Sequence, residues 1–512
     1  MAAWHRACKA SFIKLRQKFI RSLGACAWIL FFVARADAQT HLVRSLSLKE
    51  CLQIALEHSL DIKIERFAPQ IADYRLNVAY SAYEPTFDAL STRTFDKSPG
   101  GVDDENRPFP GTKTRTDEVA ASVNGVLPTG LSYDLGGRAQ DKSGRSATGP
   151  FEGSDGLVSI ELRQPLLRNF WTDGVRLEIQ MNKRFLKISE EEFRLRVMNV
   201  VTAVEFAYFD LKLAWENLRV QQSALVRAEQ LLAGQKERVA QGTLAPLDEK
   251  QAESQVASQH ADVLSAERIL AAQQNELKSL LSDDFKVWQD VVIEPVDELT
   301  APRQSFSRAA SWEVGMAQRP ELQQARLELQ RLGFVLKYRR NQMFPQLDVV
   351  GSYGYNGAGR EFSRTLSGFE RRDSPFYSYG AELSVPLGNG SARNNYKIAK
   401  SENQRSLLRL QQLEQTVLIE IEDAVKLAQT NFERVDSTQR ARLFAQQALD
   451  AEQTKFENGR STSFFVLQFQ RDLTTARLRE AQSLADYNKA LAQLTLREGT
   501  VLDRNNLKLE VK

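Results

Sequence analysis

The 512-residue chain has few cysteines, few histidines and no long apolar run beyond its first 38 residues. Only one of its three cysteines, Cys51, follows residue 38, so that part of the chain cannot form an internal disulfide. The histidines occur in no H-E-x-x-H spacing, and neither a G-x-S-x-G motif nor a phosphate-binding loop is present. The sequence therefore gives no indication of an enzyme, and we expect no cofactor and no metal site.

The first 38 residues have the pattern of an export signal. Basic residues precede a short apolar run, Ala25 to Val33, and Ala36-Asp37-Ala38 fits a small-x-small cleavage site. We expect cleavage after Ala38. This segment holds seven Lys or Arg and one Asp, so the remainder carries 61 basic and 64 acidic residues. Because the remainder has no excess of basic residues, which nucleic-acid binding requires, we expect no nucleic-acid partner.

Two proline-free stretches predict very long helices. Arg176 to Gln241 and Arg393 to Asn458 each contain 66 residues, or roughly 100 Å of helix, and each is followed by a glycine, Gly242 or Gly459. In the first stretch, apolar residues mostly alternate steps of four and three, which is the period of a coiled coil. The positions are Val197, Val201, Val204, Tyr208, Leu211, Trp215, Leu218 and Leu225. Helices of this length do not fit a compact domain.

The chain reads as two copies of one unit, 39–302 and 303–512. Each copy predicts helices, then strands, then a pair of long helices. In the first copy these are 47–83, 86–163 and 176–281, and in the second 304–344, 346–385 and 393–497. Pro69 predicts a kink in the first helical segment. Residues 291–293, as a strand, and the C-terminal segment 498–512 are expected to form a small collar around the helices.

Proline marks the change from helix to strand in both copies. Pro85 and Pro345 end helical patterns, because a residue before proline leaves the helical region. Six alternating segments are predicted as strands: 86–95, 116–127, 131–140, 157–163, 346–356 and 376–385. Polar, glycine-rich loops are expected at 97–113, 141–156 and 357–374. The strand lengths suit a membrane β-barrel. The alternative is a soluble β-sandwich inserted in a helical protein, because its strands would show the same alternation of apolar and polar residues.

Taken together, these features resemble the TolC-like outer-membrane efflux protein family. The resemblance rests on the export signal, the duplicated unit, the proline-to-strand change, "SVPLGNG" before the second long helix and "FENGRSTSFFVLQFQRDLTTARL" after it. It implies an α+β membrane protein of the cell outer membrane. In a homotrimer, three copies would complete one antiparallel β-barrel, in contact with outer membrane lipid, and one periplasmic coiled-coil tunnel.

The resemblance also implies a function and partners. The protein would be the passive outer-membrane exit duct of a tripartite efflux or type I secretion system, served by an inner-membrane transporter and a periplasmic adaptor (membrane fusion protein). Because a passive conduit takes its specificity from the pump, the sequence gives no indication of the cargo. The alternative function is a soluble periplasmic coiled-coil adaptor or scaffold, which would lack membrane strands.

The number of barrel strands departs from the family pattern. The family's usual contribution is four strands per protomer, whereas this sequence predicts four strands in the first copy and two in the second. The segment "LPTG", Leu127 to Gly130, forms a tight turn in the additional hairpin. We expect four strands in the barrel, with the additional hairpin extending it or folding beside it; six strands per protomer is the alternative.

By resemblance, the turns at the tunnel tip contact the adaptor. They are Gly242-Thr243-Leu244 and Gly459-Arg460-Ser461. The two glycines also fit ordinary helix C-caps. Both interpretations can hold, because a cap at a tunnel tip is also an exposed surface.

The expected periplasmic gate differs from that of well-studied members. Where those members carry aspartates six and nine residues after the second glycine, this chain has Phe465 and Gln468. We therefore expect an apolar gate in which three copies of Phe465 meet at the tunnel axis. The alternative is that Phe465 packs between neighbouring helices.

An ionic latch of the family is also altered in this chain. Asp248 is retained, but the tyrosine and arginine that would hold it are replaced by Phe456 and Ser461. Arg460 is one residue away, so we expect it to pair with Asp248. The alternative is that Asp248 is an ordinary first-turn helix carboxylate.

Overall fold

The computed structural model describes residues 42–102, 104–146, 149–243 and 245–507. The expected export signal, residues 1–38, lies outside the described residues, as do Leu244 of the first tip turn and the end of the expected C-terminal collar segment. Leu42–Lys512 forms one unit.

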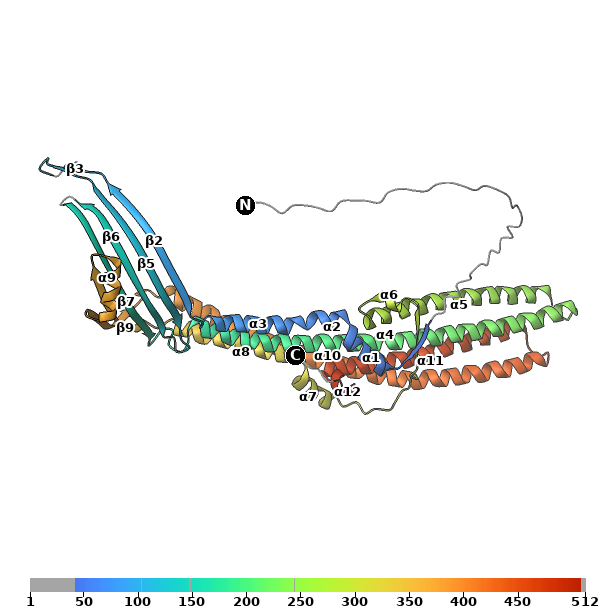
Figure 1. Ribbon diagram of the computed structural model, residues 1–512. Coiled ribbons are helices and arrows are strands. Elements are labelled where there is room, and N and C mark those ends of the chain that lie inside the picture. The colour runs from blue at the N-terminus through green and yellow to red at the C-terminus, as the bar shows by residue number, and fades with distance from the viewer. Residues whose placement is uncertain (1–41, 103, 147–148, 244, 508–512) are drawn as a thin grey trace, which may run out of the picture. The chain divides into compact units, whose positions relative to one another are not determined.

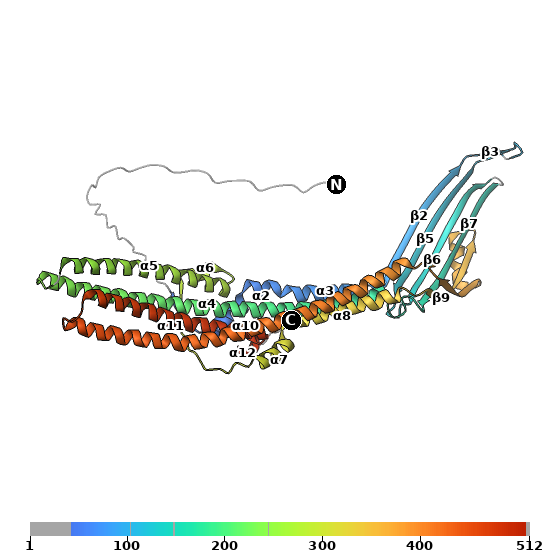
Figure 2. The same ribbon diagram turned by 180° about the vertical axis from the view of Figure 1, so that it is seen from behind.

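Two very long helices run through this unit (Figure 1, Figure 2). α4 (Gly174–Ala240) has 67 residues and α10 (Gly390–Glu457) has 68. Each is followed by a helix of 36 residues, α5 (Pro246–Leu281) after α4 and α11 (Ser463–Glu498) after α10. α4 packs against α5, α10 packs against α11, and α11 also packs against α4. None of the helices in the described ranges is long and apolar enough to cross a membrane.

The apolar stripe of α4 forms the main core. Its residues Val197, Val201, Val204, Tyr208 and Leu211 are at most 1% exposed. They pack with residues of α5 and of a small parallel sheet made of β1 (Leu42–Leu46) and β8 (Val291–Pro295). A second core joins α10 and α11 to two other helices, α7 (Arg308–Gln318) and α8 (Pro320–Asn341).

Short segments cover α4 where the expected collar lies. Ile293 of β8 is fully buried, and its backbone oxygen accepts a hydrogen bond from the Trp215 indole at 3.1 Å. α12 (Val501–Arg504) packs on α4 and on α11, with Val501 fully buried. α6 (Phe285–Trp288) follows α5 and leads into β8.

The N-terminal helical segment is divided into three helices, α1 (Leu48–His58), α2 (Leu60–Glu65) and α3 (Phe67–Ser81). The break between α2 and α3 lies just ahead of Pro69, as the expected kink requires. Proline has no N–H to donate to the carbonyl oxygen of Glu65, four residues earlier. α3 and α8 both pack against α4, and α8 also packs against α10.

A six-stranded antiparallel sheet follows the helices. Its strands are, in sheet order, β10 (Pro375–Ser384), β9 (Gln346–Gly359), β7 (Gly149–Pro165), β6 (Ser132–Ser146), β5 (Thr112–Val126) and β2 (Thr86–Ser98). The expected arrangement, four strands with the additional hairpin extending them or folding beside them, is wrong for this sheet, because all six strands pair in it. β5 and β6 lie inside the sheet, because the turn at Leu127–Gly130 is closed by two hydrogen bonds of 2.8 Å and both strands pair along their length.

Much of the sequence expected to form loops is also regular. β6 and β7 continue as a hairpin through most of 141–156, where backbone pairing holds a polar, glycine-rich segment. Within 97–113, β3 (Gly101–Val102) pairs with β4 (Pro108–Phe109). Within 357–374, Phe362–Arg371 forms a helix, α9, that packs on the sheet (Figure 1).

Candidate functional site: the helix reversals and the two faces of the sheet

Both helix reversals are glycine caps of the same kind. Gly242 and Gly459 have φ angles of +71° and +70°, which glycine adopts without strain. The residue after each glycine donates its N–H back to the helix, Thr243 to the Arg238 carbonyl at 2.9 Å and Arg460 to the Lys455 carbonyl at 2.8 Å. This is the Schellman arrangement, so the C-cap interpretation is confirmed. Contact with an adaptor at these turns stays a prediction.

Asp248 joins the two helical pairs at the tip. Its carboxylate accepts a hydrogen bond of 2.9 Å from the hydroxyl of Ser463, the first residue of α11. Ser463 is only 2% exposed. The expected partner was Arg460, but no ion pair joins Arg460 to Asp248 within the described part of the chain. A serine hydroxyl therefore replaces a guanidinium as the donor in this contact.

Phe456 makes a second link between the pairs. It packs against the core of Leu449, Val466 and Leu473 in the α10–α11 pair. The guanidinium of Arg238, from the last turn of α4, lies 4.9 Å from the centre of the Phe456 ring. Such a contact contributes on the order of 1 kcal/mol where it is partly exposed.

The expected gate residues lie on an exposed face of α11. Phe465 is 47% exposed, its neighbour Phe464 is 52% exposed, and Gln468 is also exposed. Val466 and Leu467, which separate Phe465 from Gln468 in the sequence, are buried, Val466 in the core between α10 and α11. Phe465 thus takes no part in the core of its own chain, and it is free to contact another copy or a shared axis.

Two residues of this tip were not singled out from the sequence, Arg238 and Ser463. An arginine in the last turn of a helix and a serine at a helix start are ordinary terminal residues. Their partners are 218 and 215 positions away in the numbering, so no local pattern points to either contact.

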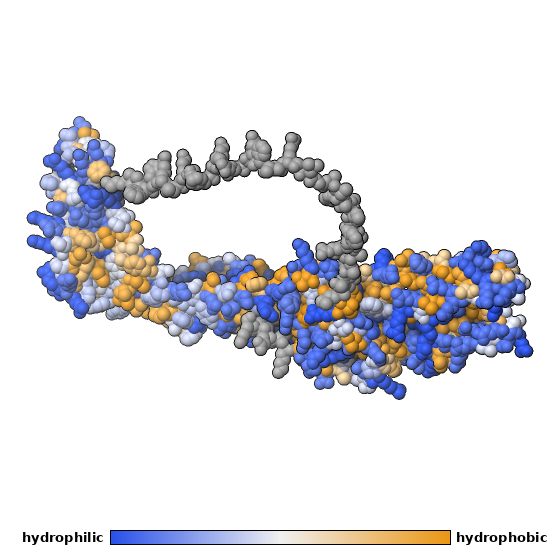
Figure 3. Space-filling view, turned by 45° about the vertical axis from the view of Figure 1, so that its right-hand side comes forward, coloured by the Kyte–Doolittle hydropathy of each residue, from blue (hydrophilic) through white to orange (hydrophobic). Residues whose placement is uncertain are grey.

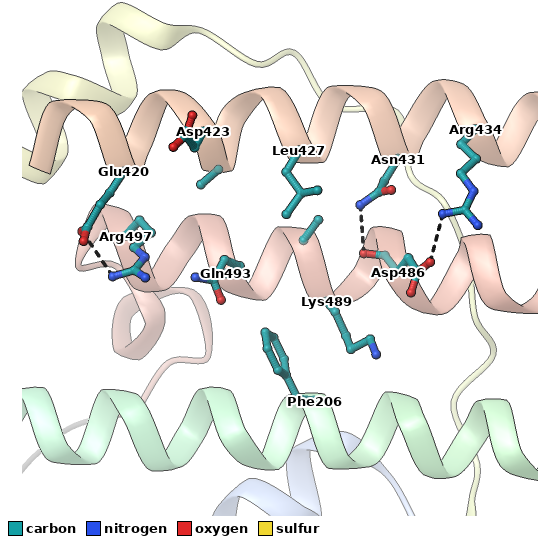
Figure 4. Close-up of a pocket in the computed structure, with 12 residues that line it drawn as sticks. Phe206, Glu420, Asp423, Leu427, Asn431, Arg434, Asp486, Lys489, Gln493 and Arg497 are labelled. Carbon is teal, nitrogen blue, oxygen red and sulfur yellow. Dashed lines mark hydrogen bonds and ion pairs between the residues drawn. The ribbon is translucent and has the colours of Figure 1, made fainter. Parts of the chain in front are cut away.

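A pocket of about 560 Å³ lies between α4, α10 and α11 (Figure 4). Its charged side chains are largely paired with one another or with α4. Arg497 lies 3.2 Å from Glu420, Arg434 lies 3.2 Å from Asp486, and Lys489 lies 2.6 Å from Asp210. This pairing indicates a contact surface between helices rather than a ligand site. In the part of the chain that is described, no group of three or more His, Cys, Asp or Glu side chains is placed to hold a metal ion.

The six-stranded sheet has two chemically different faces. Alternation along each strand and the register between strands assign each side chain to one face. We call the first the apolar face; it carries Phe87, Val119, Val123, Leu135, Val158, Ile160, Leu162, Val349, Tyr353, Tyr377, Tyr379 and Leu383. Figure 3 shows apolar residues gathered on the part of the sheet nearest the helices, whereas its far part is mostly hydrophilic.

The opposite face, which we call the polar face, carries charged residues at the same level. They are Asp88, Asp134, Arg138, Glu161, Arg163, Asp348 and Glu382. Arg163 lies 2.9 Å from both Asp348 and Glu382, so one guanidinium joins three neighbouring strands. A sheet with one apolar and one charged face suits contact with lipid on one side and water on the other.

Comparison with known proteins agrees with this geometry. A family model described as outer membrane efflux protein matches residues 51–282 and 316–500. The chain is 24% identical over 288 residues to the probable outer membrane lipoprotein SilC of Salmonella typhimurium, which covers 56% of this chain and 60% of SilC. It is 25% identical over 380 residues to the pyoverdine export outer membrane protein OpmQ of Pseudomonas aeruginosa, and this alignment covers 71% of this chain and 76% of OpmQ.

Solved structures share the fold. The Campylobacter jejuni CmeC outer membrane channel superimposes with a TM-score of 0.64 at 16% identity, covering 90% of each chain. At this identity the likeness concerns the fold alone. The family model, in contrast, matches well over half of the chain. The protein described here therefore belongs to the outer membrane efflux protein family.

Proposed function

We propose that the protein is the exit duct of a tripartite efflux or type I secretion system, which passively conducts cargo across the periplasm and the outer membrane. One observation carries this proposal. Long amphipathic helices lead directly, through α3, α8 and the starts of α4 and α10, into a sheet with one apolar and one charged face. The charged face would line a water-filled channel, and the helices would line its continuation in the periplasm.

The assembly is a homotrimer. β2 and β10 are the edge strands of the sheet, each with one edge that pairs with no described strand. β2 leads away from the helices and β10 returns to them, so β2 of one copy fits antiparallel beside β10 of the next. Three copies then close a barrel of eighteen strands, which is wide enough for an aqueous channel.

The helices also present apolar side chains that require partners. Val226, Leu264, Leu408, Ile419 and Phe444 are each at least half exposed in one copy. They lie at separate points along α4, α5 and α10, and exposed apolar side chains on long helices favour packing against another helix. Neighbouring copies would cover part of it as the tunnel closes.

The two glycine turns form the far end of the tunnel, where the periplasmic adaptor and the inner-membrane transporter engage. Gly242 and Gly459 leave space around both caps, since a Cβ added to either would meet nothing within 4 Å. Three copies of Phe465 close this end by apolar contact. A soluble adaptor is the less favoured function, because the family assignment and the apolar face of the sheet both argue against it.

Cross-linking tests the assembly. Ala89 of β2 and Ala381 of β10 are exposed on the apolar face near the helices. Ala89→Cys combined with Ala381→Cys is expected to give disulfide-linked dimers and trimers from outer-membrane fractions. Pairing Ala121→Cys, on the interior strand β5, with Ala381→Cys is the matched control. A protein that is soluble without detergent and remains monomeric would refute the proposal.

A further inference from the structure

The helix α9 (Phe362–Arg371) lies across the apolar face of β9, β7 and β6. Thr365 is fully buried in this contact. The helix approaches the strands at glycines: a Cβ added to Gly357 would lie 2.5 Å from the Thr365 carbonyl oxygen, and one added to Gly156 would lie 3.0 Å from the Phe369 ring. The sheet is therefore shaped to receive this helix.

The two flanks of α9 differ in chemistry. Arg364 and Arg371 are seven residues apart, so they lie on one flank of the helix. Phe362 and Leu366 are four residues apart and lie on the other flank, 37% and 45% exposed. Thr365 lies between the flanks and faces the sheet. A helix with one basic and one apolar flank is typical of a segment that lies in the plane of a membrane interface.

The contacts also give the direction in which each flank points. β9 leads away from the helices, and a Cβ on Gly359, its last residue, would lie 2.6 Å from Arg364 Cβ. The Phe369 ring contacts Gly357, two residues nearer to the helices. The arginine flank thus points towards the far end of the sheet. The flank with Phe362 and Leu366 points back towards the apolar part of this face.

The same end of the sheet carries further positive charge on the same face. Lys97, Lys113 and Arg145 are aligned across β2, β5 and β6, since Lys97 pairs in register with Lys113 and Lys113 with Arg145. Like charges opposite each other on neighbouring strands are destabilising unless an anion lies between them. No ion pair involves these three side chains in the described ranges.

Charge near α9 is likewise incompletely neutralised. Arg371 has Asp373 at 3.9 Å, whereas Arg364 has no acidic partner among the residues described. Glu361 precedes α9, and Glu370 lies roughly 100° around the helix from Arg371; neither forms an ion pair with Arg364 or Arg371 in the described ranges. The exposed arginines Arg360 and Arg372 adjoin the two ends of α9.

We propose that α9 is an interfacial anchor whose arginine flank, together with Lys97, Lys113 and Arg145, binds the phosphate groups of anionic lipids in the outer leaflet. This inference rests on the proposal that the sheet crosses the outer membrane. Phe362 and Leu366 enter the acyl region, and Arg364 and Arg371 lie at headgroup level, where a guanidinium forms paired hydrogen bonds with phosphate. The anchor would fix the depth of the sheet in the bilayer.

Native mass spectrometry of the detergent-extracted full chain tests the anchor. Phosphatidylglycerol is compared with phosphatidylcholine of the same acyl chains. A basic residue at an anionic surface contributes about a fivefold preference, so R364Q/R371Q should lower retention of phosphatidylglycerol on the order of 25-fold. The control R405Q/R409Q removes two exposed arginines four residues apart on α10, at least roughly 20 Å along the helix from its start beside the sheet, and should change little.

Hydrogen exchange gives a second test, part of which uses only the wild-type protein and so does not depend on a variant that folds. Hydrogen exchange of α9 in bilayers should be slower with phosphatidylglycerol than with phosphatidylcholine in the wild-type protein, and F362S/L366S should abolish this difference. Equal retention of the two lipids by the wild type, or α9 equally protected in both, would overturn the inference while leaving the channel intact. A wild-type protein that does not enter bilayers at all would refute the proposed function instead.

Discussion

Arg319 is the buried residue whose ion pairs we expect to contribute most to the packing of α8 against α10 and α11. Its side chain is 5% exposed and lies at the start of α8. One guanidinium nitrogen lies 2.5 Å from Glu420 of α10 and another lies 2.8 Å from Glu321. Arg497 of α11 also contacts Glu420, at 3.2 Å. Arg319 thus connects three helices through two carboxylates.

Arg319→Met keeps most of the side-chain volume but removes the charge. Glu321 then loses its arginine partner, whereas Glu420 keeps Arg497. Because the two carboxylates are 28% and 31% exposed, we expect a cost of about 2–3 kcal/mol, below the range for a fully buried pair. Thermal unfolding of the detergent-extracted protein, followed by circular dichroism, measures this as a lower Tm. The control is Arg308→Met, because Arg308 and Glu422 form an exposed pair at 3.4 Å whose loss should cost about 1 kcal/mol or less.

The penalty should also depend on pH. Burial by itself raises the pKa of the Glu321 carboxyl, but the hydrogen bond from Arg319 and that carboxyl's backbone hydrogen bond outweigh it and hold the pKa below its ordinary value. A carboxyl with a lowered pKa stabilises the fold above its unfolded value, near 4.3, and this contribution is lost as the pH falls through the folded pKa. The Tm difference between wild type and Arg319→Met should therefore narrow below about pH 4. A difference no larger than that of Arg308→Met at neutral pH would refute the reasoning.

The remaining predictions concern the tip and one buried acid. Phe465→Ala should raise single-channel conductance and Phe465→Asp should introduce block by divalent cations, whereas Phe464→Ala should do neither; strong divalent block of the wild type would place the gate elsewhere. Gly459→Ala forces φ near +70° on a residue with a side chain, so it should lower the free energy of local opening of the turn by about 1 kcal/mol. Hydrogen exchange at the turn should then be faster, while the global Tm stays unchanged because the helices unfold separately from this local opening. Burial raises the pKa of the Glu205 carboxyl, although a hydrogen bond from Asn505 opposes the shift. The ionised form is therefore disfavoured, and the free energy of unfolding falls as the pH rises through that pKa. Glu205→Gln should have a higher Tm than the wild type at neutral pH, and the difference in Tm should disappear in acid.

The helices could be predicted from the sequence because their signals are local and periodic. The apolar series from Val197 to Leu218 and the glycines at 242 and 459 are read within a few residues of each feature. In the structure that series is largely buried and both glycines are caps. The strand starts at Thr86 and Gln346 follow their prolines directly.

The far part of the sheet and α9 could not be predicted in the same way. In the part of the sheet far from the helices, β6 and β7 are polar and rich in glycine. They are held together by backbone hydrogen bonds, which do not depend on any pattern of side chains. α9 is only ten residues long, and such a segment is not stable alone in water. It forms where Gly156 and Gly357 allow it to approach the strands, and those residues are distant from it in sequence or lie in what reads as a loop.

In the proposed assembly, the number of strands and the composition of the tip would together place the narrowest part of the channel at the tip. A barrel of eighteen strands would be wide, and its charged lining favours water. The tip presents Phe465 and Gln468 in place of acidic residues, so dewetting rather than charge would limit passage there. Neutralising Arg163 on the polar face should then leave conductance almost unchanged while loosening its contacts with Asp348 and Glu382. A large drop or rise in conductance on Arg163→Gln would instead place the narrowest part of the channel in the sheet and would argue against the eighteen-stranded assembly.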